Sequence, residues 1–546
     1  MALRVNRTAS ASSATPSQGQ VIETHVSTLT FESDTVRKRK KAVRLPFLDL
    51  STPQLRRAAC RKEVTLNRRL SPDVYRGVDE IRDQNGRLID AIVVMRRLPG
   101  DRQLSTLIAA DADVGRELDR TAHVLAAFHS RATRGPRIDR VATRAGLGAR
   151  WEADLAELRP LVQGVLGETL GERESRLVHS YLRCRTELLE RRIAQGHIVD
   201  GHGDLRADSI FCLPDRPRII DCLEFNARLR YGDELADVAF LAMDLEGLGR
   251  PDLADRFVHS YTRFAGWTPP PGLLHFYIAH RALVRSKVAC WRVLEGETAA
   301  VSRARLHLDQ CRRHLEAARP LAIAIGGAPR TGKSTLALAL SDAVESVHLR
   351  SDEVRRDVAG RSFEATDRPD PLDRGRYSPP ITAATYRTLA ARAQSVLKAG
   401  YSVILDATFP DSSSRLQIER AVQECGVAFV AIECRADPSI IRQRARRKKD
   451  REDLSEVTPA LASVLQSRRD PWPAAHTVDT TVPAATLLRR CKDIIRDTPL
   501  PPESRHERTR VPRRKASASM GTEAGFQVDR AEGRRAMSGP RPRHAS

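Results

Sequence analysis

A glycine-containing loop between two apolar segments carries the strongest chemical signal in the sequence. Gly327, Gly332, Lys333 and Ser334 fit the pattern G-x-x-x-x-G-K-[ST], with the apolar run 321–326 before it and a Leu/Ala-rich run after it. Backbone N–H groups of such a loop point at phosphate oxygens, and the next helix turns the positive end of its dipole to the same anion. Lys333 would add charge for the β and γ phosphates, and Ser334 a hydroxyl for Mg2+.

We therefore predict an ATP phosphate site in this loop, in preference to a glycine-rich turn before a purely structural helix. Ser334 is in addition a predicted Mg2+ ligand. The residues predicted to bind ATP are Gly327, Ala328, Pro329, Arg330, Thr331, Gly332, Lys333, Ser334 and Thr335.

Two aspartates in the first half of the chain have a spacing that suits phosphoryl transfer. Asp204 belongs to the run His202-Gly203-Asp204-Leu205, and the apolar strand 218–220 leads into Asp221. One carboxylate on a loop can accept the proton of a substrate hydroxyl, while one at a strand end can hold the metal that bridges the phosphates. The alternative is a pair of ordinary turn carboxylates.

The residues before this pair predict a small sheet that carries one helix. Strands are expected at 26–31, 35–43, 78–81 and 88–95, and a helix begins after Pro53. The sheet places Lys38 and Lys40 on one face, and the helix carries Glu63 in its middle. A strand lysine with a helix glutamate is the layout of the small lobe of protein-kinase-like enzymes, where the pair orients the phosphates of ATP.

From about residue 21 to 318 the sequence resembles the aminoglycoside phosphotransferase family of kinase-like enzymes. That family's pattern is H-G-D-x-x-x-x-N followed by a strand and an aspartate. The resemblance implies that Asp204 is the catalytic base and Asp221 a metal ligand. It also implies that Lys40 (or Lys38) contacts phosphate and that Glu63 is the partner of that lysine.

The sequence departs from the family pattern at two places. Ser209 stands where the family has a metal-binding Asn, and a hydroxyl is a poorer ligand for a hard cation than an amide oxygen. Residues 32–35 contain no glycine, so no Gly-rich cover over the phosphates is visible. Two hypotheses remain open for this domain: a second phosphotransferase, or a degenerate module that binds a ligand.

The segment 321–497 alternates short apolar strands with helices, which is typical of a parallel sheet. In such sheets ligands gather at the carboxyl ends of the strands. Asp352 and Asp406 both follow apolar strands, so we expect them at the same edge as Lys333 and Ser334.

This half resembles the small-molecule kinases of the P-loop superfamily, in its loop 327–335, in Ser351-Asp352, in the run 405–408 and in the basic stretch 442–447. The resemblance implies that Asp352 orients or deprotonates the acceptor hydroxyl and that Asp406 supports Mg2+. It places three arginines in a mobile lid over the phosphates, the alternative being a solvated helix face. These arginines are Arg442, Arg444 and Arg447. The order of the two halves resembles a fused bacterial family described as bifunctional aminoglycoside phosphotransferase and ATP-binding protein.

Composition limits the classes of protein that fit. The chain has 546 residues, a formal net charge of +22 and an apolar content of 41%, which is enough for several folded cores. Nine scattered cysteines without a C-x-x-C pair argue for reduced thiols in the cytoplasm. No segment has the length of a membrane span, and part of the positive charge lies in the stretch 504–515.

The predicted architecture combines α/β and α+β parts. We expect a disordered N-terminus over 1–20, a two-lobed kinase-like domain over 21–318, a parallel-sheet P-loop kinase domain over 319–498 and a disordered basic tail over 499–546. The expected function is ATP- and Mg2+-dependent phosphorylation of a small-molecule hydroxyl, without a membrane partner; the oligomeric state stays open. The alternatives are a nucleic-acid end kinase recruited by the basic tail, which is less favoured, and a regulatory ATPase.

One helix in the first half poses a separate question. Arg281 and Arg285 lie four residues apart and therefore share a face of the helix around 277–287. They are expected either to bind an anionic substrate or, with more weight, to form a solvated face that pairs with acidic residues.

Overall fold

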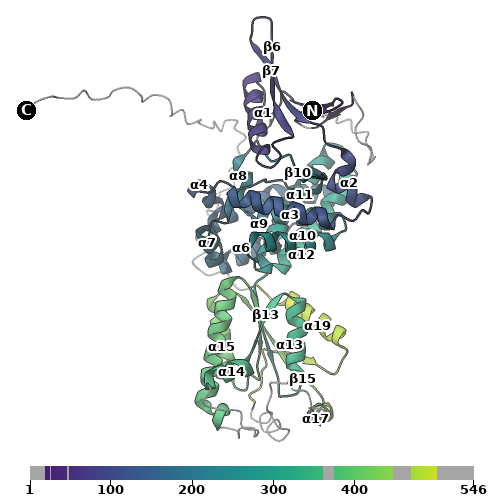
Figure 1. Cartoon of the computed structure of the whole chain (residues 1–546). Coiled ribbons are helices and arrows are strands. Elements are labelled where there is room, and N and C mark those ends of the chain that lie inside the picture. The colour runs from purple at the N-terminus through teal and green to yellow at the C-terminus, as the bar shows by residue number, and fades with distance from the viewer. Residues whose placement is uncertain (1–18, 25, 46–47, 361–373, 447–468, 501–546) are drawn as a thin grey trace, which may run out of the picture. The chain divides into compact units, whose positions relative to one another are not determined.

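The computed structural model of the chain describes residues 19–24, 26–45, 48–360, 374–446 and 469–500. The predicted disordered termini therefore lie outside the described residues, apart from positions 19–20 and 499–500. The expected combination of a kinase-like α+β part and a parallel α/β part is confirmed (Figure 1). Within the described ranges, no helix is long and apolar enough to cross a membrane.

The small lobe is an antiparallel sheet of five strands in the order β1-β2-β3-β7-β6. Helix α1 (Pro53–Asn67) packs against it through Cys60 and Val64, which belong to the same buried cluster as Val36 and Val93 of the sheet. The helix starts where expected, because Thr52 accepts a hydrogen bond from the backbone N–H of Leu55. The strands are β1 (Val21–Glu23), β2 (Ser27–Phe31), β3 (Thr35–Lys40), β6 (Tyr75–Arg82) and β7 (Leu88–Arg96), beside a short pair formed by β4 (Arg44–Leu45) and β5 (Leu48–Asp49).

The second lobe is helical around two short antiparallel strand pairs. One pair joins β9 (Ile210–Cys212) to β10 (Pro217–Ile219), and the other joins β8 (Ile198–Asp200) to β11 (Tyr231–Asp233). The helices are α2 (Leu104–Ala109), α3 (Gly115–Arg131), α4 (Pro136–Asp139), α5 (Arg144–Leu166), α6 (Glu172–Cys184), α7 (Thr186–Ala194), α8 (Ala227–Arg230), α9 (Leu235–Gly247), α10 (Pro251–Ala265), α11 (Pro271–Leu294) and α12 (Ala300–Ala317).

Helix α11 corrects one sequence-based prediction. The solvated face expected for Arg281 is wrong, because this side chain is buried. Its Nε donates a 3.1 Å hydrogen bond to the carbonyl of Ala236, and its guanidinium lies 4.9 Å from the ring centre of Phe240. A cation can occupy such a position because an aromatic face and a backbone carbonyl replace part of its hydration.

A buried carboxylate holds the loop that contains Asp204. Asp237, near the start of α9, accepts hydrogen bonds from the backbone N–H of His202 at 2.6 Å and of Gly203 at 2.9 Å, and His129 Nε2 lies 3.2 Å from the same carboxylate. Burial opposes its ionisation, but the hydrogen bond and charge of His129 outweigh burial and lower the pKa of Asp237. The loop therefore depends on an acceptor that stays ionised inside the lobe.

The C-terminal part is a parallel sheet in the order β13-β14-β12-β15-β16 with helices on both faces. Along β12 (Leu321–Gly326), Ala322 and Ala324 face the core of α15 and α16, while Ile323 and Ile325 face the core of α13 and α19. Figure 1 shows α14 and α15 on one side of the sheet and α13 and α19 on the other. The other elements are β13 (Ser346–Arg350), β14 (Ser402–Asp406), β15 (Ala428–Arg435), β16 (His476–Asp479), α13 (Lys333–Ala343), α14 (Ser351–Ala359), α15 (Pro379–Ala399), α16 (Ser412–Glu424), α17 (Pro438–Arg446) and α19 (Ala484–Asp497).

We predict that Asp237→Ala destabilises the kinase-like part by about 3 kcal/mol, because two buried N–H groups and His129 lose their acceptor. Folding lowers the pKa of Asp237, so its stabilisation is present above the ordinary carboxyl pKa and is lost as the pH falls below that value. Chemical denaturation at neutral and acidic pH measures both effects. Asp252→Ala is the matched control, since Asp252 is exposed and pairs with Arg250 at the surface. Equal unfolding midpoints for the two variants would contradict the anchoring role.

Candidate functional site

The phosphate loop lies between β12 and α13, as the sequence pattern predicted. Gly327 has φ of 142°, and a Cβ at this position would lie 2.6 Å from the carbonyl oxygen of Cys434. Only glycine therefore fits the start of the loop. Lys333 is the first residue of α13, and its Nζ donates to the carbonyl of Ala328 at 3.1 Å. The lysine thus bends back over the loop whose amides would surround a phosphate.

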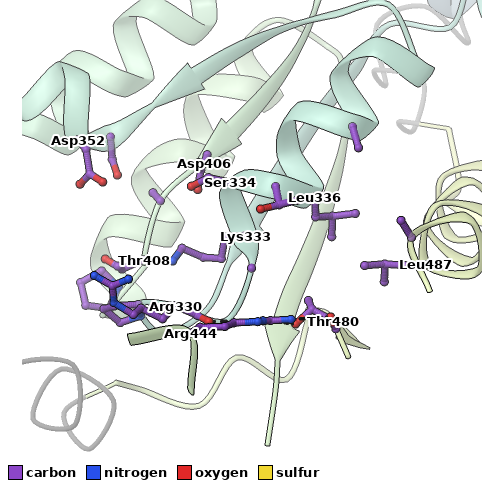
Figure 2. Close-up of a pocket in the computed structure, with 18 of the residues that line it drawn as sticks. Arg330, Lys333, Ser334, Leu336, Asp352, Asp406, Thr408, Arg444, Thr480 and Leu487 are labelled. Atoms are coloured by element: carbon purple, nitrogen blue, oxygen red, sulfur yellow. Dashed lines mark hydrogen bonds between the residues drawn. The ribbon is translucent and has the colours of Figure 1, made fainter. Parts of the chain in front are cut away.

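The loop opens into a cavity of about 570 Å3 at the carboxyl edge of the sheet. Lys333, Ser334, Asp352 and Asp406 all line this cavity, so four residues predicted separately from the sequence meet in one place. Figure 2 shows Asp406 beside Ser334, with Lys333 next to them and Asp352 farther along the same wall. A cavity of this size accommodates small-molecule ligands.

The two carboxylates of the cavity have opposite electrostatic environments. Asp406 is the last residue of β14 and is buried, with His348 Nε2 at 3.4 Å. Burial opposes its ionisation, yet His348, Lys333 and the Ser334 hydroxyl outweigh burial and lower the pKa of Asp406. Asp352 lies in the first turn of α14; burial raises its pKa, Lys333 counteracts this in part, and the charge of Asp406 raises it further.

The donor set of the cavity fits a magnesium nucleotide. Mg2+ is usually held by one or two protein oxygens together with phosphate oxygens and waters. Ser334 and Asp406 supply a hydroxyl and an ionised carboxylate next to the phosphate loop. Among the described residues, no group of three or more His, Cys, Asp or Glu side chains is arranged to hold a metal ion by itself.

Of the three predicted lid arginines, Arg444 can be placed. Its Nη2 donates to the carbonyl of Thr480 at 3.0 Å and its Nη1 to the Thr480 hydroxyl at 3.3 Å, beside the carbonyl of Arg330 in the phosphate loop. Arg444 therefore lines the cavity together with the loop (Figure 2). Arg442 belongs to α17, but its side chain lies outside the described part of the structure, as does Arg447 entirely.

The kinase-like part brings together both lysines that the sequence offered. Lys38 Nζ lies 2.8 Å from one oxygen of Glu63 and 3.3 Å from Asp221, while Lys40 Nζ lies 2.7 Å from the other oxygen of Glu63 and 2.6 Å from Glu224. Burial lowers the pKa of each lysine, but the surrounding carboxylates outweigh it, so both lysines have raised pKa values. Lys38 contacts Asp221, the predicted metal ligand, whereas Lys40 is buried and contacts Glu224 instead.

Asp204 and Ser209 lie in the same loop region and are linked through Arg206 and Asp208. The guanidinium of Arg206 is 3.5 Å from Asp204 and donates a 2.6 Å hydrogen bond to Asp208, which in turn is 3.4 Å from the Ser209 hydroxyl. Ser209 is buried, and burial raises the pKa of Asp208. Asp221 has φ of 60°, a conformation that is uncommon outside glycine and frequent at functional sites.

Three residues of these sites were missed by sequence reasoning. Glu224 pairs with Lys40, His348 contacts Asp406, and Thr480 contacts the phosphate loop. His348 lies on the strand that precedes Asp352, so the alternation along that strand could show which face its side chain occupies. Its partner Asp406, however, is 58 residues later in the sequence and lies on the neighbouring strand. Glu224 and Thr480 lie outside every motif, so no local signal could have found them.

Comparisons with known proteins agree with this architecture. The phosphotransferase enzyme family matches residues 20–273, and an AAA domain family matches residues 323–471. The uncharacterized proteins Rv2004c of Mycobacterium tuberculosis and Mb2027c of Mycobacterium bovis are each 37% identical to the chain over 463 residues, which is 85% of this chain and 92% of theirs.

Solved structures of kinases resemble each part. A choline/ethanolamine kinase family protein from Mesorhizobium loti is 15% identical, with a TM-score of 0.36, over 55% of this chain and 91% of that one. The APS kinase of Mycobacterium tuberculosis is 16% identical, with a TM-score of 0.25, over 33% of this chain and 98% of that one. The mycobacterial relatives and the family matches show that the chain belongs to a family of ATP-dependent kinases in which a phosphotransferase-family domain precedes a P-loop, AAA-type domain.

Proposed function

We propose that the C-terminal domain transfers the γ-phosphoryl group of ATP to a hydroxyl of a small molecule. The observation that carries this proposal is that Lys333, Ser334, Asp352 and Asp406 line one cavity. Lys333 and the loop amides would contact the phosphates, and Asp352, which lies apart from Lys333 in Figure 2, would contact the acceptor.

The two carboxylates divide the work because their environments differ. Asp352 acts as the general base, since a raised pKa makes a carboxylate a better proton acceptor for the acceptor hydroxyl. Asp406 stays ionised and, with Ser334, would hold Mg2+, which supplies charge neutralisation at the phosphates when it is bound. Lys333 and Arg444 orient the phosphates and offset the charge that develops during transfer.

A second site is proposed in the kinase-like domain, with Asp204 as base and Asp221 as metal ligand. Its support is the contact of Lys38 with both Glu63 and Asp221, which places one cation beside the predicted metal position. The ion pair of Lys40 with the other oxygen of Glu63 compensates part of the negative charge of this buried carboxylate. We infer that Lys38 contacts the nucleotide phosphates and that Lys40 positions Glu63. The alternative remains a domain that only binds a ligand, since Ser209 replaces the amide ligand of related kinases.

Lys333→Ala is expected to weaken ATP binding by the C-terminal domain by about a hundredfold, because the charge opposite the β and γ phosphates is lost. ATP titration and ATP consumption of the full chain, against small hydroxyl compounds and oligonucleotides, measure the effect. Lys492→Ala, an exposed lysine of the same domain, is the control. If oligonucleotides were the only acceptors that supported turnover, and that turnover fell steeply as the salt concentration rose, the nucleic-acid end kinase would be supported instead.

Asp352→Asn should retain ATP binding and lower acceptor turnover about a hundredfold, because an amide cannot take the proton. In the wild type the raised pKa of Asp352 shifts the acidic limb of the pH–rate profile above the ordinary aspartate range, and this limb should vanish in the variant. Asp406→Asn should instead raise the Mg2+ concentration needed for ATP binding. If Asp352→Asn changes the Mg2+ requirement and Asp406→Asn does not, the two roles are reversed.

The two lysines can be separated in a full-length chain that also carries Lys333→Ala. Lys38→Met should remove most of the remaining ATP binding, while Lys40→Met should mainly lower stability, by about 3 kcal/mol, because Glu63 and Glu224 lose a buried partner. Titration with ATP and thermal unfolding give the two readouts. No residual ATP binding in the Lys333→Ala chain would favour the ligand-binding alternative, and loss of ATP binding in Lys40→Met alone would reverse the assignment.

A further inference from the structure

A threonine outside every motif connects three segments at the edge of the cavity. Thr480 follows β16, and its backbone N–H donates a 3.0 Å hydrogen bond to the carbonyl of Arg435, the last residue of β15. The parallel register of β15 and β16 pairs Asp479 with Arg435, so the carboxyl edge of the sheet fixes the position of the next residue. Thr480 consequently lines the cavity beside Arg444 (Figure 2).

The side chain of Thr480 reaches the phosphate loop. Its hydroxyl donates a 2.5 Å hydrogen bond to the carbonyl of Thr331, and the carbonyl of Arg435 is a more distant acceptor at 3.3 Å. A hydroxyl has a single hydrogen to donate, so the nearer carbonyl is its main acceptor. The contact continues to Gly332, where φ is 90° and where a Cβ would lie 3.4 Å from the Cβ of Thr480.

Another carbonyl of the loop is held from within the loop itself. The carbonyl of Ala328 accepts hydrogen bonds from the Thr331 hydroxyl at 2.8 Å and from Lys333 Nζ at 3.1 Å. The carbonyl of Thr331, by contrast, accepts a hydrogen bond from no group other than Thr480 within the described residues. Its orientation thus depends on a residue that lies 149 positions later in the chain.

The orientation of this carbonyl decides where a backbone donor points. The peptide between Thr331 and Gly332 is trans, so its C=O and N–H groups point in opposite directions. A carbonyl held toward Thr480 turns the N–H of Gly332 away from Thr480. Among the residues that the structure describes, this N–H has no hydrogen-bond acceptor. A phosphate oxygen bound in the loop would provide one.

We propose that Thr480 is a positioning residue of the ATP site, whose hydroxyl orients the peptide between Thr331 and Gly332 so that the N–H of Gly332 faces the phosphates. This inference rests on the proposed function, because it concerns the ATP site of the C-terminal domain. A donor that is oriented before the ligand arrives reduces the entropy lost on binding and stabilises the charge that develops during phosphoryl transfer. Without the hydroxyl, the carbonyl of Thr331 loses its partner and the peptide can turn.

Arg444 offers a second route by which Thr480 could act on the phosphates. Its Nη1 donates to the Thr480 hydroxyl at 3.3 Å, and its Nη2 donates to the Thr480 carbonyl at 3.0 Å. The shorter of these hydrogen bonds uses the backbone, so removal of the hydroxyl leaves it in place. The hydroxyl therefore acts mainly on the peptide of the loop, and a chain that carries Arg444→Met separates the two routes.

The experiment measures ligand binding to the full chain in the presence of Mg2+. Every protein carries Lys38→Met, which removes the ATP binding proposed for the kinase-like domain. Thr480→Val keeps the shape of the side chain without the hydroxyl, and should weaken the binding of ATP and of inorganic tripolyphosphate about tenfold, while the binding of adenosine stays the same. A general distortion of the domain would weaken adenosine binding as well. Thr480→Ser keeps the hydroxyl and should bind ATP like the parent chain.

Thr481→Val is the matched control. Thr481 is exposed, its hydroxyl donates to Asp479 at 2.7 Å, and it does not line the cavity, so its substitution should leave ATP binding unchanged. In a chain that carries Arg444→Met, Thr480→Val should still lower the ATP affinity about tenfold. If the loss disappears there, Thr480 acts through the arginine alone and the proposal is overturned.

The outcomes separate this inference from the proposed function. Unchanged binding of ATP and tripolyphosphate in Thr480→Val, or an equal loss for adenosine, would overturn the positioning role, while a loss of ATP binding in Lys333→Ala would still uphold the ATP site. Unchanged ATP binding in Lys333→Ala would instead overturn the ATP site itself. Thermal unfolding without nucleotide checks that each variant is folded. If Thr480→Val is not folded, the comparison of Thr480→Ala with Thr480→Ser decides the question.

Discussion

Buried carboxylates that must remain ionised are the constraint on which both sites depend. Each one loses hydration and persists only where cations or N–H groups replace the lost water. Asp237 accepts hydrogen bonds from backbone N–H groups of the Asp204 loop and contacts His129. Glu63 forms ion pairs with two lysines, and Asp406 contacts His348 and is further stabilised by the charge of Lys333. The compensating groups come from different strands and helices, so each carboxylate also fixes the relative positions of those elements.

In the C-terminal part, the parallel sheet brings the buried carboxylate and its compensating groups together at the carboxyl ends of its strands. Because all five strands point the same way, the ends of β12, β13 and β14 bring the phosphate loop, Asp352 and Asp406 together. The positions of the two carboxylates give them different pKa shifts. Asp406 ends a strand beside His348 and Lys333, which lower its pKa, whereas Asp352 lies in the first turn of a helix, where burial and the charge of Asp406 raise its pKa. Under the proposed function, the same residue type would thus provide both the carboxylate that supports the metal and the carboxylate that acts as the base.

The kinase-like part uses a different solution, in which one glutamate is shared. Glu63 has an ion pair on each carboxylate oxygen, so the lysine nearer Asp221 can leave for a phosphate without exposing an unpaired buried charge. A single lysine and glutamate would have to exchange partners directly, at a higher cost. This duplication supports an active role for Lys38 and a structural role for Lys40.

Local patterns in the sequence determined the phosphate loop, the fold class of both parts and the carboxylates at strand ends. Steric rules act over a few residues there: the curl at Gly327, the start of α13 at Lys333 and the alternation along β12 follow from neighbouring residues. The period of two placed Lys38 and Lys40 on one face. It could not decide which lysine reaches Asp221, because that aspartate lies on another lobe.

Only the tertiary structure decided the roles that depend on distant partners. Asp237 and Arg281 are ordinary helix residues in the sequence, and both proved to be buried through contacts with other helices and with a loop. The physical reason is that the state of a charge depends on its burial and its neighbours, and folding supplies both from segments that are far apart in the chain.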